Sequence, residues 1–194
     1  MFIRLALFAL LFAAILAPSC HPAGPGGKTI TASRQLPYDD SWFLALHQFM
    51  QGYAQLGQSL HREDTVQANR QALELQNLLT QLADGVTGMQ VKDNSLDVDT
   101  VLSALGSIRA ELEGLGQETT LEDKRADYNF VTDLCYDLLL LTGFKGRILY
   151  RLHDPAAAGQ QGASWILDSV AVEGNPYNTQ GALPRYTIDT LRFQ

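Results

Sequence analysis

Apolar residues recur every three or four positions in four stretches of this chain, and each stretch is long enough for an amphipathic helix. The first three stretches are 40–61, 65–83 and 98–115. Asp64 is a candidate N-cap for the second stretch, and Gly85 follows its expected end. The expected apolar stripes are Trp42, Leu46, Phe49, Tyr53, Leu56 and Leu60; Ala68, Ala72, Leu75, Leu79 and Leu82; and Val98, Val101, Leu105, Ile108, Leu112 and Leu115.

The fourth stretch, 121–142, is apolar over more of its circumference and is closed by Gly143. Phe130 widens its apolar stripe, so we expect this helix to be the most buried of the four. Its charged start, "EDKRAD" at 122–127, is typical of a solvated face with ion pairs. Four amphipathic helices of similar length with short connections predict an up-and-down antiparallel bundle.

After residue 146 the pattern changes to short segments that alternate in part between apolar and polar residues. Three of them, 147–153, 170–173 and 185–193, are expected to be extended. The run "HDPAAAGQQGASW" at 153–165 has too much Pro and Gly for a stable helix and is too apolar for a solvated linker, so it predicts a packed loop. The predicted fold class is mainly α, a four-helix bundle with a small C-terminal extended or β tail at about 147–194.

The first 19 residues have the layout of a secretory signal peptide, with Arg4 followed by an apolar run that is too short for a membrane span of about 20 residues. The end of this region, "LAPSC", resembles a bacterial lipoprotein cleavage box, although Ala17 stands where Leu is usual. It predicts lipidation of Cys20. The alternative is an ordinary signal peptide that is cut nearby. Residues 20–37 are expected to be a flexible tether, and 38–194 a single domain.

Composition narrows the possible partners. The chain has 194 residues with 46% apolar content, enough for one domain with a core, and its formal net charge is −7. Because it is acidic and has no basic run, we expect it to bind neither nucleic acid nor anionic lipid headgroups. Cys135 has no disulfide partner if Cys20 is lipidated. We therefore expect the Cys135 side chain to be buried and to pack as a small apolar group.

The candidate chemistry is sparse. His21, His47, His61 and His153 form no His-x-x-x-His or Glu-x-x-His pattern, so a zinc or di-iron bundle site is not expected. The chain also has no Gly-x-Ser-x-Gly nucleophile motif. We therefore expect no catalytic residues and no cofactor, and we expect that the protein is not an enzyme.

The tail carries the most specific pattern. "DPAAAGQQGASW" and "NPYNTQGALPRY" resemble the C-terminal signature of a bacterial periplasmic domain-of-unknown-function family, numbered thirty-three forty-seven. That family occurs alone and appended to adaptor proteins of copper and silver efflux pumps. Its signature is roughly Cys-Pro-Met-Ala, four residues, Gly-Ala-x-Trp, then Asn-Pro-Tyr-x-Gly-x-x-Met-Leu-x-Cys-Gly, and the gap before Asn-Pro-Tyr is one residue longer here. The matching residues are Pro155, Ala157, Gly162, Ala163, Trp165, Asn175, Pro176, Tyr177 and Leu183.

The resemblance implies a soft-metal site whose ligands this chain has not kept. Asp154 and Arg185 stand at the two Cys positions, and Ala156 and Ala182 stand at the two Met positions. Thiolate and thioether are the ligands that select Cu(I), so we expect a degenerate site in which Asp154 and Arg185 form an ion pair. His153 and Asp154 are the remaining candidates for a harder metal ion. The residues that match the signature are expected to be structural.

These observations predict a non-enzymatic, lipid-anchored protein of the bacterial envelope, facing the periplasm or the cell surface, with its anchor in the outer membrane. Its expected partners are the membrane, through the lipid, and another envelope protein. A bound metal ion is not expected. The alternative, implied by the family resemblance, is a copper- or silver-binding protein or an accessory protein of metal efflux.

Overall fold

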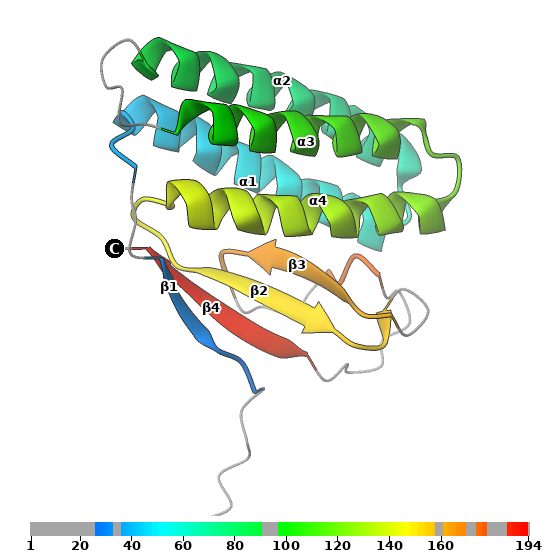
Figure 1. Ribbon diagram of the computed structural model, residues 1–194. Coiled ribbons are helices and arrows are strands. Elements are labelled where there is room, and N and C mark those ends of the chain that lie inside the picture. Colours follow the sequence, from blue (N-terminus) through cyan, green and yellow to red (C-terminus); the bar gives the residue numbers. More distant parts are fainter. Residues whose placement is uncertain are drawn as a thin grey trace, which may run out of the picture.

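The structure, a computed structural model, describes residues 26–32, 36–90, 97–157, 161–169, 174–177 and 186–193. Four sequential helices pack pairwise up and down, and a small mixed sheet lies beside them (Figure 1). The predicted mainly α fold class is therefore confirmed. The elements are β1 (Thr29–Ala32), α1 (Asp40–His61), α2 (Thr65–Gln90), α3 (Val98–Gln117), α4 (Leu121–Thr142), β2 (Leu149–Asp154), β3 (Ala163–Leu167) and β4 (Thr187–Phe193).

Local signals set several helix ends. The Asp64 carboxylate accepts a hydrogen bond of 2.9 Å from the backbone N–H of Gln67, so the predicted N-cap of α2 is confirmed. Thr120 caps α4 in the same way, accepting the backbone N–H of Asp123 at 3.1 Å. After α4 the chain turns at Gly143, whose φ of 77° favours glycine.

The predicted end of α2 at Gly85 is wrong, because the helix continues to Gln90. Gly85 serves packing instead. A Cβ atom at this position would lie 2.9 Å from Cδ1 of Trp42, so only glycine lets α2 approach the indole ring this closely. The Trp42 Nε1–H donates to the backbone carbonyl of Leu82 at 3.1 Å, which fixes the ring against α2.

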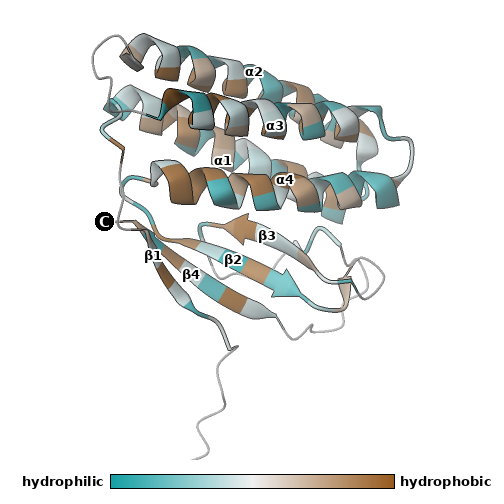
Figure 2. Cartoon of the chain, in the orientation of Figure 1, coloured by the Kyte–Doolittle hydropathy of each residue, from teal (hydrophilic) through white to brown (hydrophobic). Residues whose placement is uncertain are grey.

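The inner faces of the helices form one apolar core (Figure 2), and the three predicted stripes on α1, α2 and α3 are buried in it. Cys135 is also buried and forms no disulfide, as expected. The expectations for α4 fail at two residues. Phe130 is 57% exposed. Lys124, expected on a solvated face, is buried and its Nζ donates to the Leu115 carbonyl at 2.6 Å, where it caps the end of α3.

The sheet has the strand order β1-β4-β2-β3, with β1 parallel to β4 and the other neighbours antiparallel. Two of its strands correct the sequence analysis. β1 lies inside the segment expected to be a flexible tether, and Ile30 pairs with Leu191 of β4. β3 lies where a packed loop ending at Trp165 was expected, and Trp165 pairs with Leu152 of β2. Segment 170–173, also expected to be extended, lies outside the described residues.

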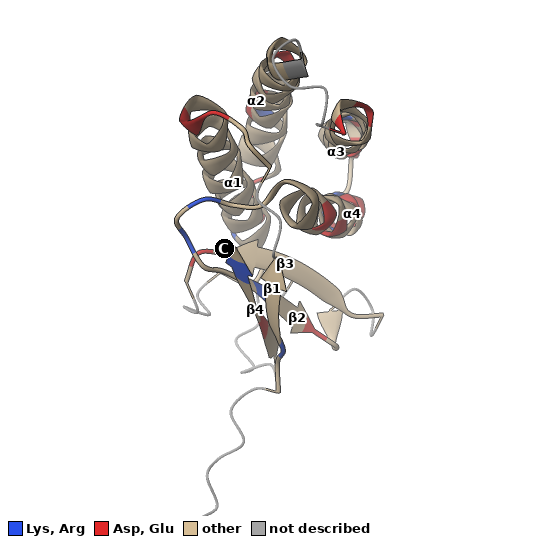
Figure 3. Ribbon diagram, turned by 60° about the vertical axis from the view of Figure 1, so that its left-hand side comes forward, with Lys and Arg blue, Asp and Glu red and all other residues tan. Residues whose placement is uncertain are grey.

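The sheet lies against the side of the bundle formed by α1 and α4, away from α2 and α3 (Figure 3). A chain of aromatic rings joins the two parts. Trp165 and Tyr177 have ring centroids 6.1 Å apart, and those of Tyr177 and Tyr128 are 6.2 Å apart. Tyr128 stacks on Tyr53 of α1 at 4.9 Å. The sheet and the bundle therefore share one core.

None of the described helices combines the length and the apolar character needed to cross a bilayer.

Candidate functional site

Asn175 and Asp154, both part of the tail pattern, form a buried polar pair. Asp154 is 1% exposed. One of its carboxylate oxygens accepts the side-chain N–H of Asn175 at 3.0 Å, and the other accepts the backbone N–H of Ala156 at 2.9 Å. The Asn175 side chain also donates to the Tyr186 hydroxyl at 3.3 Å and accepts the backbone N–H of Tyr177 at 2.9 Å. Both oxygens of the Asp154 carboxylate are thus engaged in hydrogen bonds within the protein.

Two residues outside the tail pattern, His61 and Arg125, tie this segment to the bundle. His61 Nδ1 donates to the backbone carbonyl of Asn175 at 2.9 Å. Arg125 Nε donates to the carbonyl of Pro176 at 2.6 Å, and its Nη2 donates to the carbonyl of Leu60 at 3.0 Å. These contacts link distant parts of the chain, so no local pattern could reveal them. The Asn175 and Pro176 carbonyls thus receive hydrogen bonds from α1 and α4.

His153 and Asp154, the candidate ligands for a harder metal, do not converge. They are neighbours on β2, so their side chains point to opposite faces of the sheet. His153 Nδ1 lies 3.1 Å from the Ser164 hydroxyl. Gly162, with a φ of 79°, lets the imidazole approach, because a Cβ atom there would lie 2.7 Å from its Cε1. Nowhere in the described ranges do three His, Cys, Asp or Glu residues gather as a metal site would require.

Several predicted positions fall outside the described residues. These are the lipidation residue Cys20 and the signature positions Ala182, Leu183 and Arg185. The expected ion pair between Asp154 and Arg185 therefore stays a prediction.

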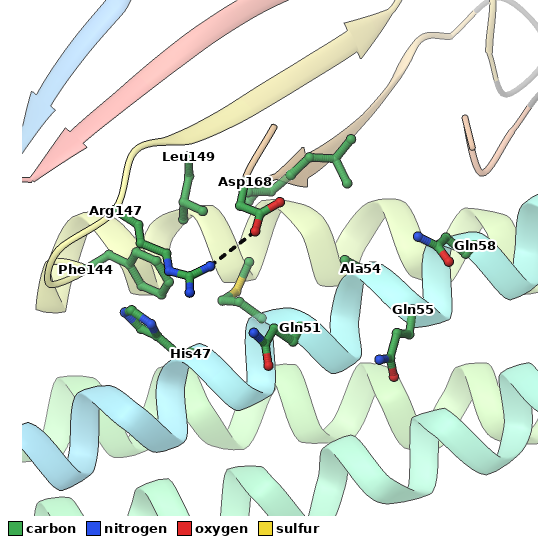
Figure 4. A pocket seen from close by; sticks show the side chains of 12 residues that line it. His47, Gln51, Ala54, Gln55, Gln58, Phe144, Arg147, Leu149 and Asp168 are labelled. Atoms are coloured by element: carbon green, nitrogen blue, oxygen red, sulfur yellow. Dashed lines mark hydrogen bonds and ion pairs between the residues drawn. The ribbon is translucent and has the colours of Figure 1, made fainter. Parts of the chain in front are cut away.

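A pocket lies elsewhere, at the junction of α1 with the end of β3. This α1–β3 pocket encloses about 420 Å³ and is lined by residues from 47–58 of α1, from 144–149 after α4, and from 166–168 at the end of β3 (Figure 4). Its inner part is apolar, with the buried side chains of Met50, Phe144, Leu149 and Ile166. The polar lining includes glutamines of α1 and an ion pair.

The glutamines of the α1–β3 pocket are Gln51, Gln55 and Gln58. Their spacing of four and three positions places them on one face of α1, along one wall of the pocket (Figure 4). All three side chains are exposed and have no hydrogen-bond partner within the described part of the chain. This spacing was visible in the sequence, but a glutamine row is more often an ordinary solvated helix face.

The ionisable side chains of the pocket are held by other groups. Arg147 Nη1 donates to Asp168 at 3.3 Å. The ring of His47 stacks on Phe144 with centroids 4.3 Å apart, and its Nε2–H donates to the Lys145 carbonyl at 2.9 Å. Burial lowers the pKa of His47, and the nearby Arg147 charge lowers it further against the opposing effect of the Lys145 carbonyl. The neutral imidazole leaves Nδ1 as an acceptor.

The free edge of β3 is largely closed by side chains. The backbone N–H of Ile166 donates to the Tyr53 hydroxyl at 3.2 Å, and that of Ser164 donates to Asn129 at 2.9 Å. The Tyr177 hydroxyl donates to the Ser164 carbonyl at 3.0 Å. The Ile166 carbonyl is the next group along this edge, and it has no such partner among the described residues.

We expect Tyr53→Phe to lower the free energy of unfolding by about 1–3 kcal/mol. The Tyr53 hydroxyl lies 2.6 Å from Thr132, whose own hydroxyl donates to the Tyr128 carbonyl, so Tyr53 donates to Thr132 and accepts from Ile166. The variant leaves the buried Ile166 N–H without a partner. Urea denaturation measures the change. Tyr150→Phe is the control, because the Tyr150 hydroxyl makes no hydrogen bond within the described ranges, and equal losses in both variants contradict the prediction.

We expect stability to fall as the pH drops through about 6.5, in part because of His47. The pKa of His47 is lowered in the folded protein, mainly by burial, so the unfolded chain binds more protons between the folded and unfolded pKa values. The stability contributed by neutral His47 is present above that window and is lost as the pH falls through it. Urea midpoints from about pH 7.5 to about pH 5.5 should drop more for the wild type than for His47→Gln. Since His61 and His153 are common to both proteins, identical pH profiles contradict the assignment.

Comparison of the chain with known protein families, with curated proteins and with solved structures found no match. The resemblance of the tail to the periplasmic domain family therefore stays a prediction.

Proposed function

We propose that this chain is a non-enzymatic, lipid-anchored binding module of the bacterial cell envelope, and that the α1–β3 pocket holds its ligand. The observation that carries the proposal is the pocket itself. It is concave, has an apolar inner part with polar groups at its edge, and lies where a helix meets a sheet, as ligand sites commonly do. By contrast, Asn175, Pro176 and Tyr177 of the tail pattern make contacts that hold the sheet on the bundle.

The lining of the pocket favours binding over catalysis. Among the described residues that line the pocket there is no Ser, Thr, Cys, Tyr or Lys, so none of them gives His47 a nucleophile to activate. Asp168, the carboxylate in the lining, is paired with Arg147. These groups can orient a ligand, but they do not form the nucleophile and base arrangement that acyl or phosphoryl transfer requires.

The hydrogen bonds of Asp154 favour this binding module over the copper or silver alternative. The signature positions that the structure describes supply neither thiolate nor thioether, and the Asp154 carboxylate is bonded to Asn175 and Ala156. A soft cation needs ligands of the kind that these positions lack.

The lipid anchor is tested by Cys20→Ala in the full chain. Lipidation attaches the protein to the membrane through this sulfur, so we expect the variant to move from the membrane fraction to the soluble fraction after cell lysis. Immunoblots of the two fractions measure the change. A variant that stays in the membrane fraction to the same extent as the wild type contradicts the anchor.

Site-specific photo-cross-linking tests the pocket in living cells. A photoreactive residue is placed at Gln55, which lines the pocket, or at Gln48, which is exposed on α1 outside the lining. We expect an adduct from position 55, its loss when Ala54→Trp fills the pocket, and no such adduct from position 48. Adducts of equal yield from both positions, or none from position 55, contradict binding at this site.

A further inference from the structure

We propose that the α1–β3 pocket binds an extended, uncharged peptide segment of about five residues that places one large apolar side chain in the inner part of the pocket. This inference rests on the proposed function and names the ligand class of the same site. Five properties of the pocket support it: its length, its sheet edge, its glutamine wall, its balanced charge and its apolar inner part.

The length of the pocket fits a short extended chain. The lining residues of α1 run from His47 to Gln58. At about 1.5 Å per residue, this part of α1 is about 16 Å long. An extended peptide rises about 3.3 Å per residue, so five residues span the same distance.

One wall of the pocket offers a strand edge. Ile166 and Leu167 of β3 belong to the lining, and β3 is an edge strand. The Ile166 N–H points away from β2, since it donates to Tyr53, and the carbonyl of the same residue points to the same side. A peptide N–H is the natural partner for this carbonyl, as in strand addition. Tyr53, Asn129 and Tyr177 close the rest of the edge, so the peptide pairs only at its end.

The opposite wall suits peptide amides. Gln51, Gln55 and Gln58 each offer one carbonyl acceptor and two N–H donors, which match the alternating N–H and C=O groups of an extended backbone. Because the three side chains lie in a row along α1, they follow a peptide that runs parallel to the helix.

The charge of the lining favours an uncharged ligand. Arg147 and Asp168, the cation and the anion among the described lining residues, are paired with each other. A carboxylate, phosphate or amine ligand has to break this pair or lie beside a neutral wall, and both reduce its affinity. A sugar is less suited than a peptide, because the face of Phe144, the aromatic platform in the lining, is covered by His47.

The inner part of the pocket provides side-chain selectivity. Met50, Leu149 and Ile166 line it with apolar atoms, and all three are buried. A Leu side chain that enters this space leaves water, whereas Gly at the same position of the peptide gains nothing. We therefore expect the pocket to prefer a large aliphatic residue at the centre of the bound segment.

The test uses the full chain and N-acetylated, C-amidated pentapeptides with Leu at the centre and Thr or Gln at the four flanking positions. Binding is measured by fluorescence anisotropy of labelled peptides and by saturation-transfer NMR. We expect the Leu-centred peptides to bind at least about tenfold more tightly than the same peptides with a central Gly. Gln55→Ala, an exposed substitution that leaves the fold intact, should weaken binding about fivefold, while Gln48→Ala should not change it. Ala54→Trp should abolish it.

Four outcomes overturn the peptide proposal. Peptides that bind equally well to the Ala54→Trp variant occupy another site. The pocket has a different ligand class if a chitin-derived trisaccharide, or a peptide with charged flanks, binds more tightly than the uncharged peptides. This holds only if Ala54→Trp abolishes that binding. Absence of peptide binding together with a pocket-dependent cross-link at position 55 rejects the peptide but leaves the binding module. Absence of both rejects the proposed function as well.

Discussion

Replacing Asn175 by alanine should lower the free energy of unfolding by about 3 kcal/mol. The variant removes one of the two described hydrogen-bond partners of the Asp154 carboxylate, which is 1% exposed. Removing a partner from a buried charged group is costly, because the group keeps its desolvation penalty without the compensating bond. The loss also frees the backbone N–H of Tyr177. Urea denaturation of the full chain, followed by far-ultraviolet circular dichroism, measures the change.

A double-mutant cycle assigns the loss to the pair. In the Asp154→Ala background the carboxylate is absent, so Asn175→Ala should cost at least about 1 kcal/mol less than it does in the wild type. Asn77→Ala on the exposed face of α2 is the matched control and should change stability by less than about 0.5 kcal/mol. If Asn175→Ala changes the free energy of unfolding as little as this control does, Asn175 does not anchor the tail. If the losses of the two single variants add up in the double variant, Asn175 and Asp154 are not energetically coupled.

The helices could be predicted because their signals are local. Apolar spacing placed α1 and α4 at the bounds that the structure has, and the predicted cap of α2 at Asp64 is confirmed. Where the prediction failed, a residue from another element decided the outcome. Gly85 does not end α2, because its role is to make room for Trp42 of α1. Lys124 is buried, because its ammonium bonds Leu115 at the end of α3.

The sheet could be predicted only in part, because its pairings are non-local. β1 joins the sheet through β4, and the backbone N–H of Lys28 bonds the Asp189 side chain across almost the whole chain, at 2.8 Å. A short segment in a Pro- and Gly-rich region carries no signal for such a partner. β3 is buried along most of its length, so it lacks the alternation that marks a strand with one exposed face.

The described residues of the tail pattern lie at packing and hydrogen-bonding positions between the sheet and the bundle. Trp165, Asn175 and Tyr177 organise the contact between the sheet and the bundle. The candidate ligand site lies elsewhere, and three separate segments build it. Neither the row of glutamines on α1 nor the Arg147 and Asp168 pair suggests a site until the fold brings them to one cavity.

Trp165→Ala should have the largest effect, a loss of about 3–5 kcal/mol of unfolding free energy. Trp165 is among the largest fully buried side chains, and its removal leaves a cavity in the sheet beside Tyr186, whose ring centroid lies 5.1 Å away. Trp165→Phe should cost less, because the smaller ring still fills part of the space. It also serves as the measurable variant if Trp165→Ala does not fold.

The two tryptophans of the chain, Trp42 and Trp165, make this experiment a test of the shared core. In both Trp165 variants the remaining fluorescence comes from Trp42, which lies in the bundle and bonds α2. The aromatic rings of Tyr177, Tyr128 and Tyr53 make the sheet part of the core of the bundle. When the sheet loses Trp165, the unfolding transition reported by Trp42 fluorescence should therefore move to lower urea concentration. In Trp42→Phe the fluorescence comes from Trp165. The unfolding transition that it reports should coincide with the transition measured by circular dichroism. If Trp42 reports an unchanged midpoint in the Trp165 variants, the sheet unfolds as a separate unit and the aromatic contacts do not couple it to the helices.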